Sequence, residues 1–153
     1  VLAVSGVGAV DVLARLVPIV ETTTVGGETW TIEHPLFDAG GLQHLFDGDP
    51  YTLVRGYEAN PLVLKVTFPS PRPLTALDLT TGSMDLALTV RLIPADGSEA
   101  RVYSQTYSDL PNDPSVTLEF SGAPPAVTQV EIEVLHLTEP GAAKIHLREI
   151  VLR

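Results

Sequence analysis

The chain has 153 residues, of which 44% are hydrophobic, and a formal net charge of -10. This length and apolar content are enough for one domain with its own core, and they exclude an intrinsically disordered chain. The negative charge repels nucleic-acid phosphate, so nucleic acid is not expected as a partner. Cysteine is absent, which excludes disulfides and thiol nucleophiles.

Residues 1–28 are predicted to be an N-terminal lead-in segment or linker. The first twenty residues are mostly apolar, but Asp11 and Arg15 and helix breakers at 6, 8 and 18 make them a poor membrane span. Two interpretations stay open: a segment packed partly on the following domain, or the end of a linker or membrane segment. Because the chain begins with Val1 and its only methionine is Met84, we expect a fragment of a larger protein.

From Trp30 onward, apolar residues recur with a period of two. Leu62, Leu64, Val66 and Phe68 form one such row, and Pro or Gly interrupts the chain between successive rows. No amphipathic helix intervenes, so residues 29–153 are predicted to be all-β, an antiparallel β-sandwich of the eight-stranded jelly-roll type. The predicted strands cover 29–34, 62–68, 74–81, 84–93, 99–107, 115–120, 127–137 and 144–152.

The segment LFDGDPYTLVRG, at residues 45–56, carries the strongest motif of the chain. Asp47 and Asp49 place carboxylates close together, and Gly48 permits a left-handed bend between them. With the oxygen of Thr52 nearby, this turn offers the oxygen ligands that hard cations such as calcium prefer. The alternative is a solvated Asx turn, held by its own side chains.

This turn resembles the DGD-x-x-T turn of discoidin (coagulation factor 5/8 type C) domains and family 32 carbohydrate-binding modules, and LREIVLR at 147–153 resembles their closing strand. The resemblance covers about residues 30–153. It implies a galactose-binding-like sandwich that binds without catalysis, a structural calcium ion and an extracellular or extracytoplasmic location. The implied calcium ligands are side-chain oxygens of Asp49 and Glu149, oxygens of Phe46 and Thr52 from the turn, and Asp47 as a further ligand.

Glu149 distinguishes the cation site from the Asx turn. On a regular strand its side chain points the same way as those of Leu147 and Val151. A carboxylate buried among them is costly unless it is paired or bound to a cation. This placement therefore favours the cation.

The best candidate ligand-binding cluster follows the turn and comprises Tyr51, Arg55, Tyr57 and Glu58. Sugar sites combine an aromatic plane with a few polar groups, which these residues supply. The alternative is that both tyrosines pack the loop while Arg55 pairs with an acid. Neither an HExxH zinc motif nor a G-x-S-x-G nucleophile is present, so no enzyme is expected.

The predicted function is therefore a noncatalytic module that binds carbohydrate or a cell-surface ligand, appended to other domains of a parent protein. The alternative is a ligand-free structural accessory domain of a membrane-anchored glycosyltransferase-like protein. Val54 fits this alternative, because the resembled family usually has a Trp at that position.

Overall fold

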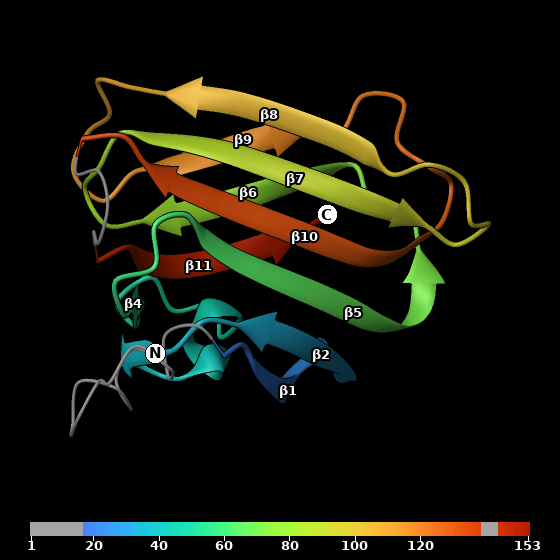
Figure 1. Ribbon diagram of the computed structural model, residues 1–153, viewed down its shortest axis with the longest axis horizontal. Coiled ribbons are helices and arrows are strands. Elements are labelled where there is room, and N and C mark those ends of the chain that lie inside the picture. The colour runs from blue at the N-terminus through green and yellow to red at the C-terminus, as the bar shows by residue number, and fades with distance from the viewer. Residues whose placement is uncertain (1–16, 139–143) are drawn as a thin grey trace, which may run out of the picture.

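Two antiparallel sheets form a sandwich in residues 17–138 and 144–153, the part of the chain that the computed structural model describes (Figure 1). In order across the larger sheet, the strands are β1 (Ile19–Val25), β2 (Glu28–His34), β5 (Leu62–Arg72), β10 (Val127–His136), β7 (Leu86–Pro94) and β8 (Arg101–Tyr107). In the smaller sheet they are β3 (Phe37–Ala39), β4 (Val54–Gly56), β11 (His146–Leu152), β6 (Ala76–Thr81) and β9 (Ser115–Glu119). A short 3-10 helix, η1, spans Leu42–Leu45.

The core lies between the sheets and follows the period of two in the sequence. On β5, Leu62, Leu64 and Val66 are fully buried, while the residues between them reach the surface. Strands β7 and β10 repeat this pattern: β10 pairs with β5 on one side and with β7 on the other, with a register shift between Val127 and Gln129. Because the buried rows of both sheets meet, burial of aliphatic side chains stabilises the sandwich.

All eight predicted strands are confirmed, with ends that differ by a few residues. Three further strands escape the sequence pattern: β3 and β4 have only three residues each, and β1 lies at a sheet edge with most of its side chains exposed. The described part of the chain therefore has eleven strands rather than eight.

Strand β1 lies inside the segment predicted to be a lead-in or linker. It pairs with β2 along its whole length, from Ile19 opposite His34 to Val25 opposite Glu28. The connection uses Gly26 and Gly27, both with positive φ, as a two-residue hairpin turn requires. The predicted boundary at residue 29 thus falls within this hairpin. Residues 1–16 lie outside the described part of the chain. Within the described part, no helix is long and apolar enough to cross a membrane.

The closing strand β11 is irregular at its centre, and this changes the predicted environment of Glu149. Its register against β6 shifts between Leu147 and Glu149, as in a β-bulge. Leu147 and Ile150, three residues apart, are therefore both buried, while Val151 is exposed. The prediction that Glu149 shares the face of Leu147 is wrong, because the bulge reverses the alternation between them.

Candidate functional site

The DGD turn has the hydrogen bonds of an Asx turn. Asp47 Oδ1 accepts a bond of 2.9 Å from the Asp49 N–H, and Asp49 Oδ1 accepts one of 2.9 Å from the Tyr51 N–H. The Thr52 hydroxyl donates to Asp47 Oδ2 at 2.8 Å. Gly48 has a φ of 73° between the two carboxylates, a left-handed conformation that glycine adopts readily. The turn is therefore internally organised by its own side chains.

Glu149 from β11 reaches this turn across 101 residues of sequence. The Gly48 N–H donates to Glu149 Oε1 at 3.3 Å. Glu149 Oε2 is buried and has no hydrogen-bond partner within the described residues. Burial raises the pKa of Glu149, and the nearby negative charges of Asp47 and Asp49 raise it further. Burial and like charge thus both act against the charged form of this carboxylate.

The neighbouring Asp47 has the opposite shift. Burial acts to raise the pKa of Asp47, but the hydrogen bonds from the Asp49 N–H and the Thr52 hydroxyl outweigh it and lower that pKa. Asp47 is therefore held as a carboxylate beside Glu149. Two acidic groups with opposed shifts face one small space, an arrangement that a bound cation would relieve.

The carboxylates near the DGD turn do not form a cation site by themselves, so further oxygens from the turn would be needed. In the part of the chain that the structure describes, no group of three or more His, Cys, Asp or Glu side chains is arranged to hold a metal ion. The three carboxylates of the implied ligand set, Asp47, Asp49 and Glu149, therefore do not form such a group, and oxygens of Phe46 and Thr52 would have to complete the coordination. The unpartnered, buried oxygen of Glu149 is the observation that fits a cation.

The predicted ligand-binding residues are divided by β4. Tyr51 lies in the turn before this strand and is 89% exposed, whereas Tyr57 and Glu58 follow its end. Arg55 on β4 donates to both carboxylate oxygens of Asp38, at 2.6 and 3.1 Å. Tyr51 and Tyr57 therefore lie on opposite sides of β4 along the chain.

Two residues that the sequence did not indicate connect Arg55 with Tyr57. Lys144 donates to Asp38 at 3.0 Å, and its ammonium lies 5.6 Å from the centroid of the Tyr57 ring. The hydrogen bond from Arg55 is the main cause that lowers the pKa of Asp38, so this carboxylate stays charged. Asp38 and Lys144 are far apart in the sequence and carry no motif, and only strand pairing brings them together.

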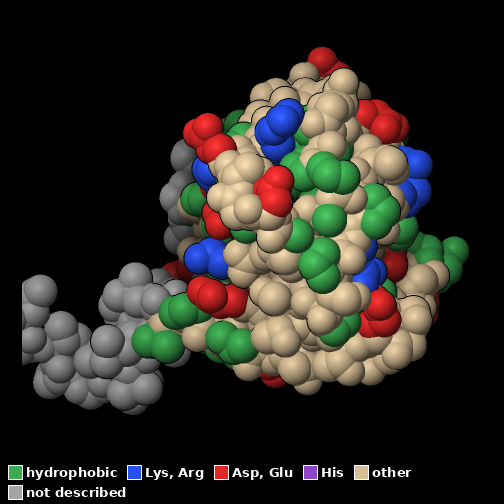
Figure 2. Space-filling model, turned by 90° about the vertical axis from the view of Figure 1, so that its right-hand side faces the viewer, with side chains coloured by type: hydrophobic (Ala, Val, Ile, Leu, Met, Phe, Trp, Pro, Cys, Tyr) green, Lys and Arg blue, Asp and Glu red, His purple; other side chains and the backbone are tan. Residues whose placement is uncertain are grey.

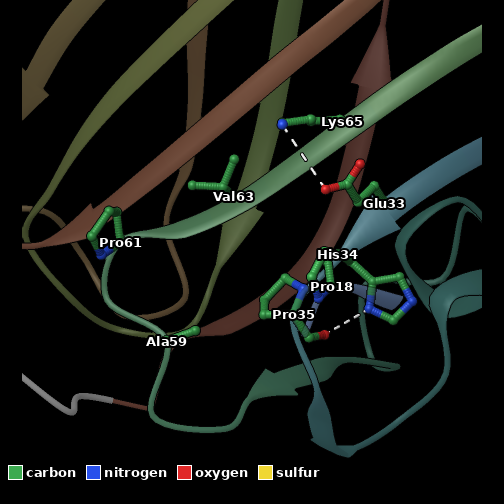
Figure 3. Close-up of a pocket in the computed structure, with 8 residues that line it drawn as sticks. All are labelled: Pro18, Glu33, His34, Pro35, Ala59, Pro61, Val63 and Lys65. Carbon is green, nitrogen blue, oxygen red and sulfur yellow. Dashed lines mark hydrogen bonds and ion pairs between the residues drawn. The ribbon is translucent and has the colours of Figure 1, made fainter. Parts of the chain in front are cut away.

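A cavity of about 380 Å³ on the larger sheet was also missed (Figure 3). Glu33 from β2 and Lys65 from β5 lie at one end of it, 3.9 Å apart. His34 holds one wall: its ring nitrogens contact the Pro35 carbonyl and Glu21 Oε2, each at 2.7 Å. The lining residues are Pro18, Glu33, His34, Pro35, Ala59, Pro61, Val63 and Lys65.

A second hollow, of about 490 Å³, lies beside the DGD turn. Arg72 is ion-paired with Glu28 there, and its guanidinium lies over the rings of Phe68 and Trp30, at 4.4 and 5.3 Å from their centroids. Trp30 is only 4% exposed. Trp30 therefore offers little ring surface to a ligand, and Phe46, which is half-buried, is the other aromatic residue of this lining.

At one end of the sandwich, no single type of side chain dominates the surface (Figure 2). Figure 2 shows this face, on which acidic, basic and hydrophobic side chains are interspersed. A mixed surface of this kind is ordinary for a soluble domain face. The cavity and the DGD turn are therefore the more specific features.

No family model and no curated protein sequence matches the chain. Solved structures do. The F5/8 type C domain of a Bacteroides fragilis protein superposes with a TM-score of 0.65 at 15% identity, over 87% of this chain and 95% of that one. The chain has the discoidin-like fold.

Two further structures extend this likeness in fold. The Clostridium perfringens module CpGH89CBM32-4, solved with glcNAc-alpha-1,4-galactose, has a TM-score of 0.59 at 14% identity, over 80% of this chain and 88% of that chain. Chitosan-binding module 1 of a Paenibacillus chitosanase/glucanase has a TM-score of 0.59 at 14% identity, over 82% and 94%. The discoidin-like fold predicted from the DGD turn and the closing strand is thus confirmed.

Proposed function

We propose that this discoidin-like domain is a noncatalytic glycan-binding module of a larger protein at an extracellular or extracytoplasmic surface. The observation that carries the proposal is the fold, which the chain shares with one module solved with a glycan and with another named for binding chitosan. Function resides in sites rather than in folds, so the site needs its own tests.

The first test concerns glycan binding. Affinity electrophoresis and a glycan array with the whole chain are expected to show retention by at least one glycan. If the cluster after β4 contributes, Tyr57→Ala weakens that retention, while Tyr51→Ala, on the other side of β4, leaves it unchanged. Silence across all glycans would instead favour a ligand-free structural accessory domain.

We also propose a structural calcium ion in the DGD turn, held by the side chains of Asp49 and Glu149 with oxygens of Phe46 and Thr52, and with Asp47 as a further ligand. When bound, the ion supplies the positive charge that the carboxylates lack. Glu149 then ties the last strand to the turn. The proposed calcium ligands and the structural role of the ion rest on the buried oxygen of Glu149 and on the resemblance of the DGD turn to the turn of discoidin domains.

Thermal melts test this calcium proposal. A ligand that binds only the folded state raises the melting temperature by mass action, so calcium should raise it and EDTA should reverse the rise. Asp49→Asn and Glu149→Gln are expected to abolish the shift. Asp78→Asn is the matched control, because Asp78 lies in the same sheet but pairs with Arg153. An unchanged melting temperature in the unmodified protein would refute the calcium site.

A further inference from the structure

The cavity on the outer face of β2 and β5 combines an apolar wall with a single charged pair. Pro61, Ala59 and Val63 lie on one side of it, and Pro18 and Pro35 on the other (Figure 3). None of its lining residues is Phe, Tyr or Trp, and the one aromatic ring in the lining, the imidazole of His34, is only 3% exposed. A sugar ring therefore has no aromatic plane to stack on, and the apolar walls suit a smaller group such as a methyl.

The charged pair is set by strand register. Glu33 and Lys65 lie directly opposite each other on β2 and β5. Their closest N–O distance is 3.9 Å, which is longer than a hydrogen bond. Both side chains are about 40% exposed, at 41% for Lys65 and 37% for Glu33. The ammonium can therefore still donate, and the carboxylate can still accept.

The remaining polar side chain of the lining, that of His34, already has hydrogen-bond partners. Both ring nitrogens of His34 have partners, in Pro35 and Glu21, and the ring stacks on Phe37 with centroids 4.3 Å apart. His34 is only 3% exposed. It fixes the shape of the cavity, and the polar selectivity of the cavity rests on Glu33 and Lys65.

A neutral ligand group matches this arrangement better than a charged one. A ligand carboxylate is attracted by Lys65 but repelled by Glu33, and a ligand ammonium is attracted by Glu33 but repelled by Lys65, so the pair as a whole favours neither charge. A planar amide avoids both penalties, since its N–H donates to the carboxylate while its oxygen accepts from the ammonium. The methyl of an acetamido group then meets the Pro, Ala and Val wall.

We propose that this cavity is a subsite for the acetamido group of an N-acetylated amino sugar. The assignment rests on the proposed glycan-binding function and names the sugar class that the domain selects. The volume of about 380 Å³ is in the range of small-molecule pockets. The lining of the subsite includes none of Asp38, Arg55 and Lys144, the cluster at the smaller sheet.

The test compares three matched probes with the whole chain: the methyl glycosides of N-acetylglucosamine, glucose and glucosamine. Affinities come from calorimetry, and the site comes from amide chemical-shift changes in NMR spectra. We expect N-acetylglucosamine to bind about tenfold or more tightly than the other two, as for hydrogen bonds to charged groups. The shift changes should centre on Val63 and Lys65.

Two variants separate the subsite from the rest of the domain. Lys65→Met and Glu33→Gln are each expected to weaken N-acetylglucosamine binding by about tenfold. Arg91→Met is the matched control: Arg91 lies on β7, in the same outer row of the same sheet, and does not line the cavity. Melting curves of all three variants verify that each is folded.

The outcomes distinguish this inference from the proposed function. Glycan binding that ignores the acetamido group, or that survives Lys65→Met and Glu33→Gln, overturns the subsite and leaves the glycan-binding function standing. Absence of binding to every glycan overturns both. N-acetyl-lysine amide bound as tightly as N-acetylglucosamine would overturn the sugar assignment, because an acetylated peptide would then fit equally well.

Discussion

Gly40, directly after β3, occupies a position that rejects any side chain. Its φ is +75°, and a Cβ there would lie 2.1 Å from the Leu53 carbonyl oxygen and 3.1 Å from Val54 Cα. Both contacts are with backbone, which cannot rotate away. This close approach seats the chain before η1 against the segment that leads from the DGD turn into β4.

Replacing Gly40 tests how rigid this contact is. Gly40→Ala is expected to lower the free energy of unfolding by about 3 kcal/mol or more, because backbone strain and a steric clash add. Gly97→Ala is the control: its φ is +77°, with no atom within 4 Å of the new Cβ, so the expected loss is about 1–2 kcal/mol. Urea unfolding measures both, and equal losses would show that the loop relaxes around the methyl.

The conformation of the DGD turn was predictable because the motif is local. Asp47, Gly48 and Asp49 determine their own turn through short-range hydrogen bonds. The face of Glu149 was not predictable, because the bulge in β11 follows from pairing with β6. The cavity beside Glu33 and Lys65 could not be predicted either, since its walls come from separate segments and no residue type marks them.

At the scale of elements, the outer face of β11 gathers positive charge. His146 pairs with Arg55 on β4, and Arg148 follows it on the same strand. Burial lowers the pKa of His146 below its ordinary value of 6.5, and Arg55 and Arg148 lower it further, while Asp38 opposes them. His146 is therefore neutral in the folded protein at pH values where an unfolded chain is partly protonated.

This shift makes stability depend on pH. As the pH falls below 6.5, the unfolded state binds a proton at His146 before the folded state does. The stabilisation that comes from a neutral His146 is therefore complete above pH 6.5 and is lost as the pH falls to the folded-state pKa. His146→Gln is expected to flatten the pH dependence of the unfolding free energy just below pH 6.5. NMR titration of the ring should give a midpoint below 6.5, and Arg148→Met should raise it. An identical pH slope in His146→Gln would contradict the assignment.

Strands with a regular buried row were predictable, whereas β1, β3 and β4 were not. β8 was predicted although it lies at a sheet edge and most of its side chains are exposed. β5 and β7 have strict alternation because both lie inside a sheet with one wet face. β1 has no such row, since it pairs only with β2 and most of its side chains are exposed. β3 and β4 are too short to show a period, and tertiary pairing alone makes them strands.

At the scale of the whole molecule, the last strand is the centre of the smaller sheet. β11 pairs with β4 on one side and with β6 on the other. It also buries Leu147 and Ile150 and places Glu149 at the DGD turn. The first described strand, β1, has the opposite position, at an edge with one neighbour.

Two truncations should therefore differ in kind. Removal of residues 146–153 splits the smaller sheet into β3–β4 and β6–β9, and the loss of Leu147 and Ile150 alone costs about 3–6 kcal/mol of hydrophobic burial. Domains have only about 5–15 kcal/mol of stability, so we expect no cooperative melt and collapsed NMR dispersion. Among the described residues, removal of residues 1–25 takes only Val17, Pro18 and the edge strand β1, so it should lower the melting temperature while keeping a cooperative transition. A cooperative melt without β11 would show that the larger sheet folds without the closure of the sandwich.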